Sequence, residues 1–453
     1  MFNTPFPQDF IWGAATSAYQ IEGAVNADGR GESIWDRFSH TPGKTRDGHT
    51  GDMACDHYHR YEEDVALMAQ LGLKAYRFSI AWPRILPQGR GAVNQAGLDF
   101  YRRLVDALLA HTITPYVTLF HWDLPVALQD AGGWPQRATA EAFAEYAGVV
   151  AAALGDQVRH WITINEPWCI SFLSHQLGEH APGLRDWPAA IAASHHTLLA
   201  HGLGTQAIRA AAPHAEVGLA LNFTAAEPAS AAPADRDAAR HFDGYYNRWF
   251  LDAVAGHGYP ADMVADYTAA GYLPKGMDFV HPGDLALIAA PSDFFAFNYY
   301  TREVLAAGPQ PWQYQIVRPP TPRTEMGWEI YPEGLYKLLL RLHSHYSLPR
   351  IILSENGVSY LDPLEADGRV HDQGRIAYIQ QHLATCQRAI AAGVPLTGFF
   401  YWSLLDNFEW AFGYHQRFGL IHVDYNTQRR YPKDSFFWYR EVIRANQLPV
   451  GDG

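Results

Sequence analysis

The sequence of 453 residues is poor in cysteine and in charged side chains. It holds three cysteines and no CxxC pair, so neither a disulfide framework nor a cysteine-based zinc site is expected. Charged residues make up 18% of the chain, below the roughly 25% of an average globular domain. Hydrophobic residues make up 48%, which is enough to bury a large core and excludes a disordered chain.

Several function classes are excluded by other features that the sequence lacks. Its 34 Lys and Arg are outnumbered by 47 Asp and Glu and form no basic cluster, so no nucleic-acid partner is expected. No apolar stretch reaches the length of about 18 residues that a membrane span needs, and no HExxH zinc motif occurs. The N-terminus lacks the basic and apolar regions of a secretory signal, and few cysteines fit a reducing compartment, so a cytoplasmic location is expected.

Eight short apolar runs are spaced along the chain, and each has the length of a buried strand. They lie at 11–15, 76–80, 116–120, 161–164, 217–221, 294–297, 351–353 and 398–401. Near-continuous apolar runs are typical of parallel strands that are covered on both faces. Most runs are followed by segments of helical period, such as 94–111 and 372–392. The pattern predicts an α/β fold, a single (β/α)₈ barrel domain over residues 1–453 with elaborated loops.

A doubly wound sheet is the alternative to the barrel. That fold favours a glycine-rich phosphate turn after the first strand, whereas Gly13 is followed by two alanines, so the barrel is the better interpretation. Two stretches, 225–237 and 301–330, are rich in Ala, Pro, Gly or Ser and are expected to be irregular. Because the second is longer than an ordinary connection, we expect it to form a wall or lid of a site.

Polar and aromatic residues follow five of the apolar runs. In chain order they include His121, Trp122, Asn165, Glu166, Asn298, Tyr300, Glu355 and Trp402. The carboxyl ends of barrel strands open on one mouth, so these side chains are expected in one pocket. Glu166 and Glu355 would face each other there, and a pair of carboxylates across a small site is typical of glycoside hydrolysis. Two structural acids at loop starts are the alternative, which the accompanying Asn165 and the aromatic residues disfavour.

Four motifs make the sequence similar to a known family. They are FIWGAATSAYQIEG at 10–23, TINEP at 163–167, SENG at 354–357 and LLDNFEW at 404–410. From about residue 6 to residue 445 the chain resembles the family 1 glycoside hydrolases, the β-glucosidase group. The resemblance implies a retaining β-glucosidase that removes terminal β-D-glucosyl units from small or oligomeric β-glucosides without metal or organic cofactor. A β-galactosidase or β-fucosidase of the same family and a carbohydrate-binding pseudoenzyme remain the alternatives.

The resemblance also implies a role for each matching residue. Glu166 looks like the acid/base and Glu355 like the nucleophile, which Arg77 and Tyr300 would keep charged. Ser354 replaces the more usual Thr of its motif and keeps the hydroxyl. The implied substrate-binding residues are Gln20, His121, Trp122, Asn165, Asn298, Tyr300, Trp328, Trp402, Glu409 and Trp410. The carboxylate of Glu409 would repel a phosphate, so an unphosphorylated sugar is expected.

Other candidates lie close to these motifs. Trp168, Leu173, His180 and Trp328 are expected on the leaving-group side, with packing in the core of a loop as the alternative. Cys169 lies three residues beyond Glu166, and we interpret it as a buried inert thiol because no His–Asn arrangement accompanies it.

Overall fold

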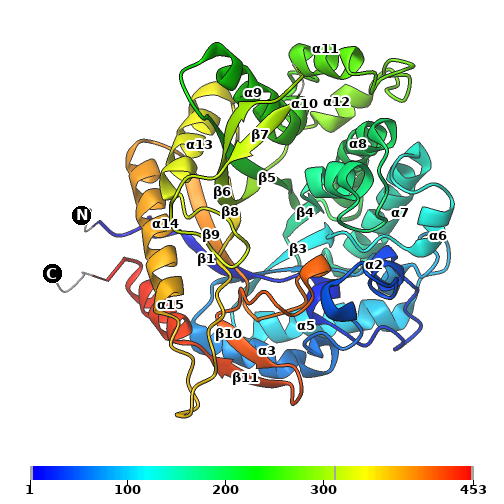
Figure 1. The fold of residues 1–453 in the computed structure, drawn as a ribbon. Coiled ribbons are helices and arrows are strands. Elements are labelled where there is room, and N and C mark those ends of the chain that lie inside the picture. Colours follow the sequence, from blue (N-terminus) through cyan, green and yellow to red (C-terminus); the bar gives the residue numbers. More distant parts are fainter. Residues whose placement is uncertain (1–3, 311–312, 450–453) are drawn as a thin grey trace.

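The computed structural model describes residues 4–310 and 313–449, and its centre is a barrel of eight parallel strands (Figure 1). These are β1 Ile11–Ala15, β2 Ala75–Ser79, β3 Thr114–Phe120, β4 His160–Asn165, β5 Glu216–Pro228, β6 Phe295–Ala307, β8 Ile351–Asn356 and β9 Leu396–Trp402. Each strand pairs in parallel with its neighbours, and the β1–β9 and β5–β6 pairings close the ring. The predicted (β/α)₈ barrel is confirmed.

Helices surround the barrel, as Figure 1 shows. The long ones are α3 His57–Leu71, α5 Gln95–Ala110, α7 Arg137–Leu154, α8 Trp187–Ala211, α13 Pro332–His345, α14 Gln373–Ala391 and α15 Asp434–Ala445. Shorter ones in the loops are α1 Ala18–Ile21, α2 Ile34–Ser39, η1 Arg46–Gly48, α4 Trp82–Ile85, α6 Val126–Asp130, η2 Cys169–Leu177, α9 Pro233–Asp243, η3 Gly244–Arg248, α10 Trp249–Val254, α11 Ala261–Ala269, α12 Asp284–Ile288 and η4 Trp410–Phe412. In α5 the stripe of Leu98, Leu104 and Leu108 is buried, as its helical period predicts.

The two stretches expected to be irregular are partly strands, so that expectation is wrong in part. β5 continues through Pro228 and β6 through Ala307, and the extensions pair with each other, with Ala226 opposite Glu303. β7, Tyr314–Val317, then pairs antiparallel with β6. Hydrogen bonding between distant segments stabilises these extensions, whose composition alone does not favour a strand. A separate two-stranded sheet is formed by β10 Ile421–Asp424 and β11 Arg429–Pro432.

Large side chains fill the inside of the barrel. Tyr116, Ile162, Phe294, Ile352 and Phe400 are buried in one cluster there. A side chain on Gly13 would place its Cβ 2.3 Å from the ring of Phe400, so only glycine fits at this position of β1. The packed interior forms the rigid floor on which the strand ends are positioned.

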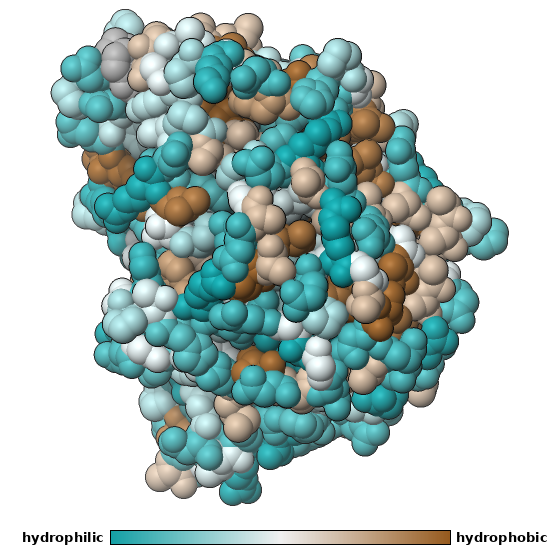
Figure 2. Space-filling model, turned by 90° about the vertical axis from the view of Figure 1, so that its right-hand side faces the viewer, coloured by the Kyte–Doolittle hydropathy of each residue, from teal (hydrophilic) through white to brown (hydrophobic). Residues whose placement is uncertain are grey.

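The ends of the described chain lie on the same side of the molecule (Figure 1), where the amide of Phe6 donates to the carbonyl of Asn446 at 2.9 Å. Figure 2 shows one face of the surface, on which hydrophilic residues predominate and hydrophobic ones form small separate patches. Scattered apolar patches are normal on a folded protein. Within residues 4–310 and 313–449, no helix has the length and apolarity to cross a membrane.

The contact at Gly357 allows a test of the packing between β8 and β9. A Cβ on Gly357 would lie 1.7 Å from the carbonyl oxygen of Trp402, which is backbone and cannot rotate away. We expect Gly357→Ala to lower the free energy of unfolding by about 3 kcal/mol, measured as a lower thermal unfolding midpoint.

Gly148→Ala is the matched control. Gly148 lies inside α7, and its Cβ would make an ordinary contact of 3.8 Å with Ala207. Because alanine favours a helix over glycine, we expect this variant to gain up to about 1 kcal/mol. Equal midpoints for the two variants would contradict the packing described at Gly357.

Candidate active site

A cavity of about 550 Å³ lies at the carboxyl ends of the barrel strands. The predicted site residues that line it are His121, Trp122, Glu166, Asn298, Tyr300, Trp328, Glu355, Trp402, Glu409 and Trp410. Gln20, Arg77 and Asn165 lie behind this lining and are at most 1% exposed. The fold therefore brings the predicted residues together, with these three as a buried layer that contacts the others.

Glu355, in β8, is held at both carboxylate oxygens. Its Oε1 accepts a hydrogen bond from Nη1 of Arg77 at 2.6 Å, and its Oε2 accepts one from the hydroxyl of Tyr300 at 2.7 Å. Burial raises the pKa of Glu355 above its ordinary value, while Arg77 and Tyr300 oppose the rise. The ionised form of Glu355 is thus the one that its neighbours stabilise.

Glu166 follows β4 and has very different surroundings. Its Oε1 accepts from Nδ2 of Asn298 at 2.8 Å, and its Oε2 accepts from the thiol of Cys169 at 3.1 Å. Among the ion pairs of the described residues, none involves Glu166. Burial, together with the charge of Glu355, raises the pKa of Glu166 to about 7. Glu166 can therefore hold a proton near neutral pH.

The two carboxylates are linked by a short hydrogen-bonded chain. Nη2 of Arg77 donates to Oδ1 of Asn165 at 2.6 Å, and Nδ2 of Asn298 donates to the same oxygen at 3.1 Å. The hydroxyl of Ser354 donates to Oδ1 of Asn298 at 2.7 Å, so the serine supplies the hydroxyl expected at this position. These hydrogen bonds fix the positions of the two carboxylates relative to each other.

A third carboxylate, Glu409, also lines the cavity, and Gln20 is buried beside it. The amide of Gln20 donates to Oδ1 of Asn407 at 3.0 Å and to the carbonyl of Phe408 at 2.9 Å, and it lies 3.4 Å from Oε2 of Glu409. Burial raises the pKa of Glu409 to about 8, and the charges of the other two carboxylates add to this rise. This wall is an acceptor-rich surface suited to sugar hydroxyls.

His121 completes the inner wall as a neutral ring. Burial, aided by Arg77, lowers the pKa of His121 well below its ordinary value. Nδ2 of Asn165 lies 3.2 Å from Nε2 of His121, and the buried Nδ1 has no partner among the described residues. If Nε2 accepts from Asn165, the proton of the neutral ring resides on Nδ1, which is then a free donor at the cavity.

Three residues of the cavity wall adopt left-handed backbone conformations that favour glycine. Their φ angles are +84° for Trp122, +51° for Glu166 and +46° for Trp410. Such conformations cost about 1–3 kcal/mol each and persist where the surrounding structure fixes them. The indole of Trp122, for example, donates to the carbonyl of Asn165 at 3.0 Å.

The residues predicted for the leaving-group side, Trp168, Leu173, His180 and Trp328, all line the cavity. Nδ1 of His180 is buried without a partner among the described residues, and the Trp328 ring lies 5.2 Å from that of Tyr300. The contact of Cys169 with Glu166 was not predicted from the sequence, and neither were the cavity-lining residues Tyr246, Glu303 and Tyr314. The spacing of three residues between Glu166 and Cys169 was the available signal, because such residues share a side of a helical turn.

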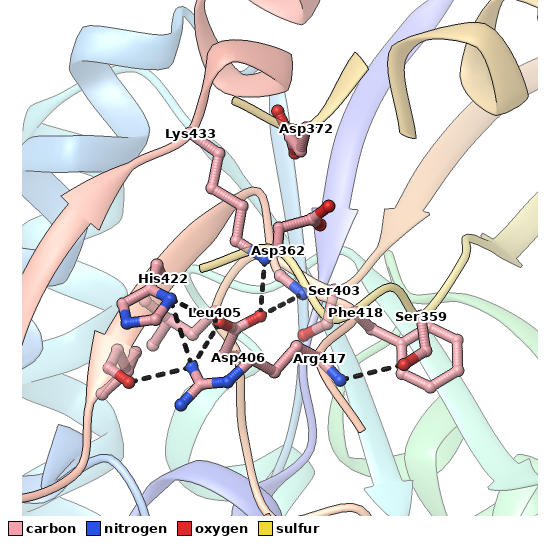
Figure 3. A network of polar contacts seen from close by, with 12 residues as sticks. Ser359, Asp362, Asp372, Ser403, Leu405, Asp406, Arg417, Phe418, His422 and Lys433 are labelled. Carbon is pink, nitrogen blue, oxygen red and sulfur yellow. Dashed lines mark hydrogen bonds and ion pairs between the residues drawn. The ribbon is translucent and has the colours of Figure 1, made fainter. Parts of the chain in front are cut away.

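The loop that carries Glu409 and Trp410 is anchored by the buried charge of Asp406 (Figure 3). Oδ1 of Asp406 accepts from Nζ of Lys433 at 3.0 Å and from the amide of Gly419 at 2.9 Å, and Oδ2 accepts from Arg417 at 2.7 Å. Burial lowers the pKa of Lys433 to about 8. The loop is thus fixed by ion pairs shielded from water.

One group among the described residues has the ligand types for a metal ion, namely Asp47, His49 and His415, whose ligand atoms lie within 4.8 Å of one another. None of the three lines the cavity. Nδ1 of His49 accepts from the amide of Tyr414 at 3.2 Å, which places the proton of a neutral ring on Nε2, and His415 already pairs with Asp47 at 2.5 Å. The hydrogen bonding at this group therefore does not favour a metal.

Known proteins match this chain along nearly its whole length. Residues 2–448 match the family Glycosyl hydrolase family 1. The beta-glucosidase A of Acetivibrio thermocellus is 49% identical over 451 residues, which cover 98% of this chain and all of that protein. The bifunctional beta-D-glucosidase/beta-D-fucosidase of Bifidobacterium breve is 46% identical, with 97% of this chain and 98% of that protein covered. The solved family 1 b-glucosidase from Thermotoga maritima, also 46% identical, has a TM-score of 0.95 and covers 98% of this chain and 100% of that chain.

The ion pairs of Asp406 can be tested by measuring the stability of variants that lack one of them. Replacing Lys433 with Met leaves a buried carboxylate with one cation fewer, so we expect Lys433→Met to destabilise the fold by about 3 kcal/mol at neutral pH. The control is Lys337→Met, because Lys337 pairs with Glu227 but is 56% exposed. Its loss should cost less than about 1 kcal/mol. Thermal unfolding of both variants distinguishes them, and a Lys433→Met protein as stable as the control would contradict the anchoring role.

Proposed function

Because the chain belongs to glycosyl hydrolase family 1, we propose that it is a retaining β-glucosidase. It removes terminal non-reducing β-D-glucosyl units by two displacements through a covalent glycosyl-enzyme. Residues 1–453 act as one catalytic barrel domain, without a metal or organic cofactor. A reducing compartment, the cytoplasm, is part of the proposal, supported by three cysteines that are all free and buried.

The contrast between the two carboxylates is the observation that carries the proposal. Glu355 accepts hydrogen bonds from a cation and a hydroxyl group, whereas the donors to Glu166, Asn298 and Cys169, are both neutral. Two acids whose surroundings differ in this way take the roles of nucleophile and proton donor. A binding protein without turnover has no need of this difference, which disfavours a pseudoenzyme.

In the first step, an oxygen of Glu355 forms a bond to the anomeric carbon as the glycosidic bond breaks. Glu166 gives its proton to the departing oxygen, so the leaving group departs as an alcohol and Glu166 becomes ionised. Arg77 loses its charged partner when Glu355 becomes an ester. In a retaining enzyme the two carboxyl groups are expected about 5–5.5 Å apart, because one of them attacks the anomeric carbon directly.

In the second step, water attacks the anomeric carbon and Glu166 takes its proton. Esterified Glu355 no longer carries the charge that raised the pKa of Glu166, so Glu166 can stay ionised and act as the base. The ester bond breaks, Glu355 leaves as a carboxylate beside Arg77, and glucose is released with its original β configuration.

The inner wall accounts for recognition of the sugar. Glu409 accepts hydrogen bonds from hydroxyls, the buried Gln20 beside it holds its position, and Trp402 offers a ring to the sugar face. Among the described residues no cation pairs with Glu409, so a phosphate there would meet a carboxyl group and no positive partner, and the proposed sugar is unphosphorylated. β-Fucosidase activity is a second candidate because the Bifidobacterium breve relative is named for both activities.

Proton NMR during hydrolysis of 4-nitrophenyl β-D-glucoside tests the proposal. We expect β-glucose as the first product, before the anomers equilibrate. Glu355→Ala should lower turnover by about 10⁴-fold or more because the nucleophile is gone. The control is Glu365→Ala, which removes an exposed carboxylate and should leave turnover unchanged. Early α-glucose, or full activity in the Glu355→Ala protein, would rule out the proposed mechanism.

The thiol of Cys169 provides a pH-dependent test. Free Glu166 must be protonated to act as the acid, so kcat/KM should fall as pH rises through about 7. The hydrogen bond from Cys169 stabilises the ionised form and lowers the pKa of Glu166. We expect Cys169→Ala to move the alkaline limb upward by up to about one pH unit.

Cys169→Ser is the matched control for this shift. Serine keeps a donor at the same position, so its alkaline limb should stay near that of the unchanged protein. An alkaline limb that stays in place or moves downward in the Cys169→Ala protein would show that the thiol does not tune Glu166.

A further inference from the structure

A second cavity, of about 10 Å³, lies directly behind the wall of the large one. Trp122 lines the large cavity, and the next residue, Asp123, lines the small one. Tyr19 lines the small cavity too, and its ring stacks on that of Trp410, which lines the large cavity, at a centroid distance of 6.1 Å. The two cavities therefore share a wall, and the groups in the small one support residues of the proposed sugar site.

The carboxyl group of Asp123 is buried without a partner. The residue is 1% exposed, and neither carboxyl oxygen has a hydrogen-bond partner among the described residues. No ion pair within 4 Å involves Asp123 in that part of the chain. Asp372, by contrast, is also buried but accepts from Nε of Arg375 and from the amide of Ser435, both at 2.8 Å. Because a buried carboxylate needs such donors, the site of Asp123 does not suit the ionised form.

The cations near Asp123 are already paired with other carboxylates. Nε of Arg84 donates to Oε2 of Glu22 at 2.8 Å, and Nη1 of Arg30 lies 2.8 Å from Oδ2 of Asp36. Together with Asp123, three buried carboxyl groups share two guanidinium groups, and Asp123 is the one left over. Burial raises the pKa of Asp123 to about 8, since Arg30 opposes the rise only in part and Glu22 adds to it.

The other titratable groups near Asp123 are tyrosines. Tyr19 lines the same cavity, and the hydroxyl of Tyr101 donates to Oε1 of Glu22 at 2.6 Å. Burial raises the pKa of both, and also that of Tyr146, on which the charge of Asp123 acts. All three tyrosines are therefore neutral near pH 7. The lining residues without a titratable side chain are Ala18, Gly23, Val25, Gly51 and Ala81.

We propose that Asp123 is kept as a neutral carboxylic acid that binds one water molecule in the small cavity, and that this unit positions Trp122 against the sugar. A cavity of about 10 Å³ is close to the smallest that admits a water molecule. The acid donates to the water, and the carboxylate of Glu22 in the same lining offers acceptors to it. Because Arg30 and Arg84 also line the cavity, a bound metal cation is disfavoured.

The backbone at Trp122 explains why its neighbour needs a fixed protonation state. Trp122 has a φ of +84°, a conformation that persists only where the surroundings hold it, and its ring packs against Trp410 at 4.6 Å. Ionised Asp123 would bring a third carboxylate beside Glu22, and the segment would have to move to hydrate it. Asp123 is thus a positioning residue. Its effect on the sugar rests on the proposed function, whereas its protonation does not.

Asp123→Asn tests the protonation, because asparagine has nearly the same shape and cannot ionise. The unfolded chain releases the proton of Asp123 near pH 4, whereas the folded protein keeps it up to about pH 8. From about pH 5 to pH 8, the unchanged protein should therefore lose stability relative to Asp123→Asn. The ratio of their unfolding constants, measured with urea, should grow by about tenfold per pH unit.

Asp372→Asn is the matched control, since Asp372 is buried but paired with Arg375. This variant should unfold at a lower urea concentration than the unchanged protein at pH 7. A ratio for Asp123→Asn that stays constant with pH would overturn the inference. So would a stabilisation by sodium chloride over choline chloride that Asp123→Asn abolishes, because a metal cation would then take the place of the proton.

The positioning role is tested by kcat/KM for 4-nitrophenyl β-D-glucoside at pH 6. Asp123→Ala, which removes the hydrogen bond to the water, should lower it by about 10- to 100-fold. Asp123→Asn keeps a donor at the same place and should stay within about 3-fold of the unchanged protein. Equal values for Asp123→Ala and Asp123→Asn would overturn the positioning role. A protein that hydrolyses no β-glucoside would instead contradict the proposed function, while a constant stability ratio contradicts this inference alone.

Discussion

The ion pair between Arg77 and Glu355 is the interaction on which the charge balance of the site depends. Three carboxylates, Glu166, Glu355 and Glu409, line one cavity, and burial raises the pKa of each. Arg77 compensates this burial at one of them, because its guanidinium contacts Glu355 directly at 2.6 Å. The other two are left with polar neighbours of no net charge. Because Arg77 contacts only one of the three carboxyl groups, Glu355 is stabilised as the ionised form, whereas Glu166 and Glu409 can hold a proton.

The fixed position of Arg77 follows from the barrel. Arg77 is an interior residue of β2, and its side chain also donates to Thr118 of the adjacent strand and to the carbonyl of Ser354 in β8. Its planar group with several donors suits this set of acceptors, whereas a lysine could not meet them all. The left-handed conformations of Trp122 and Glu166, just after β3 and β4, and of Trp410, at the start of η4, are the energetic cost of directing these side chains into the cavity. Packing across the whole barrel offsets that cost.

Much of the fold and of the inner site was predictable, because both depend on local sequence. The eight apolar runs marked the strands, and the polar residues just after them marked the mouth, since strand ends converge in any barrel. The parts that were not predictable depend on pairing between distant segments. The extension of β6 pairs with β5 and with β7, and these short segments, 301–307 and Tyr314–Val317, are flanked by Pro- and Gly-containing stretches that predict irregular structure. Likewise, the contacts of Asp406 with Arg417 and Lys433 cannot be read from the motif that contains Asp406.

The predictable and the unpredictable features correspond to two different walls of the same cavity. The inner wall consists of strand ends and of the loop anchored by Asp406, and its side chains are fixed by buried hydrogen bonds and ion pairs. The outer wall consists of the β6–β7 hairpin and the adjoining helices, where β7 is an edge strand with exposed positions such as Ile316. A substitution in the inner wall disturbs the charge balance around Arg77, whereas one on the hairpin face changes only what the cavity can hold. Both walls include β6, whose first half holds Asn298 and Tyr300 against Glu166 and Glu355 and whose second half forms the hairpin, so residues of the hairpin can vary while those contacts stay in place.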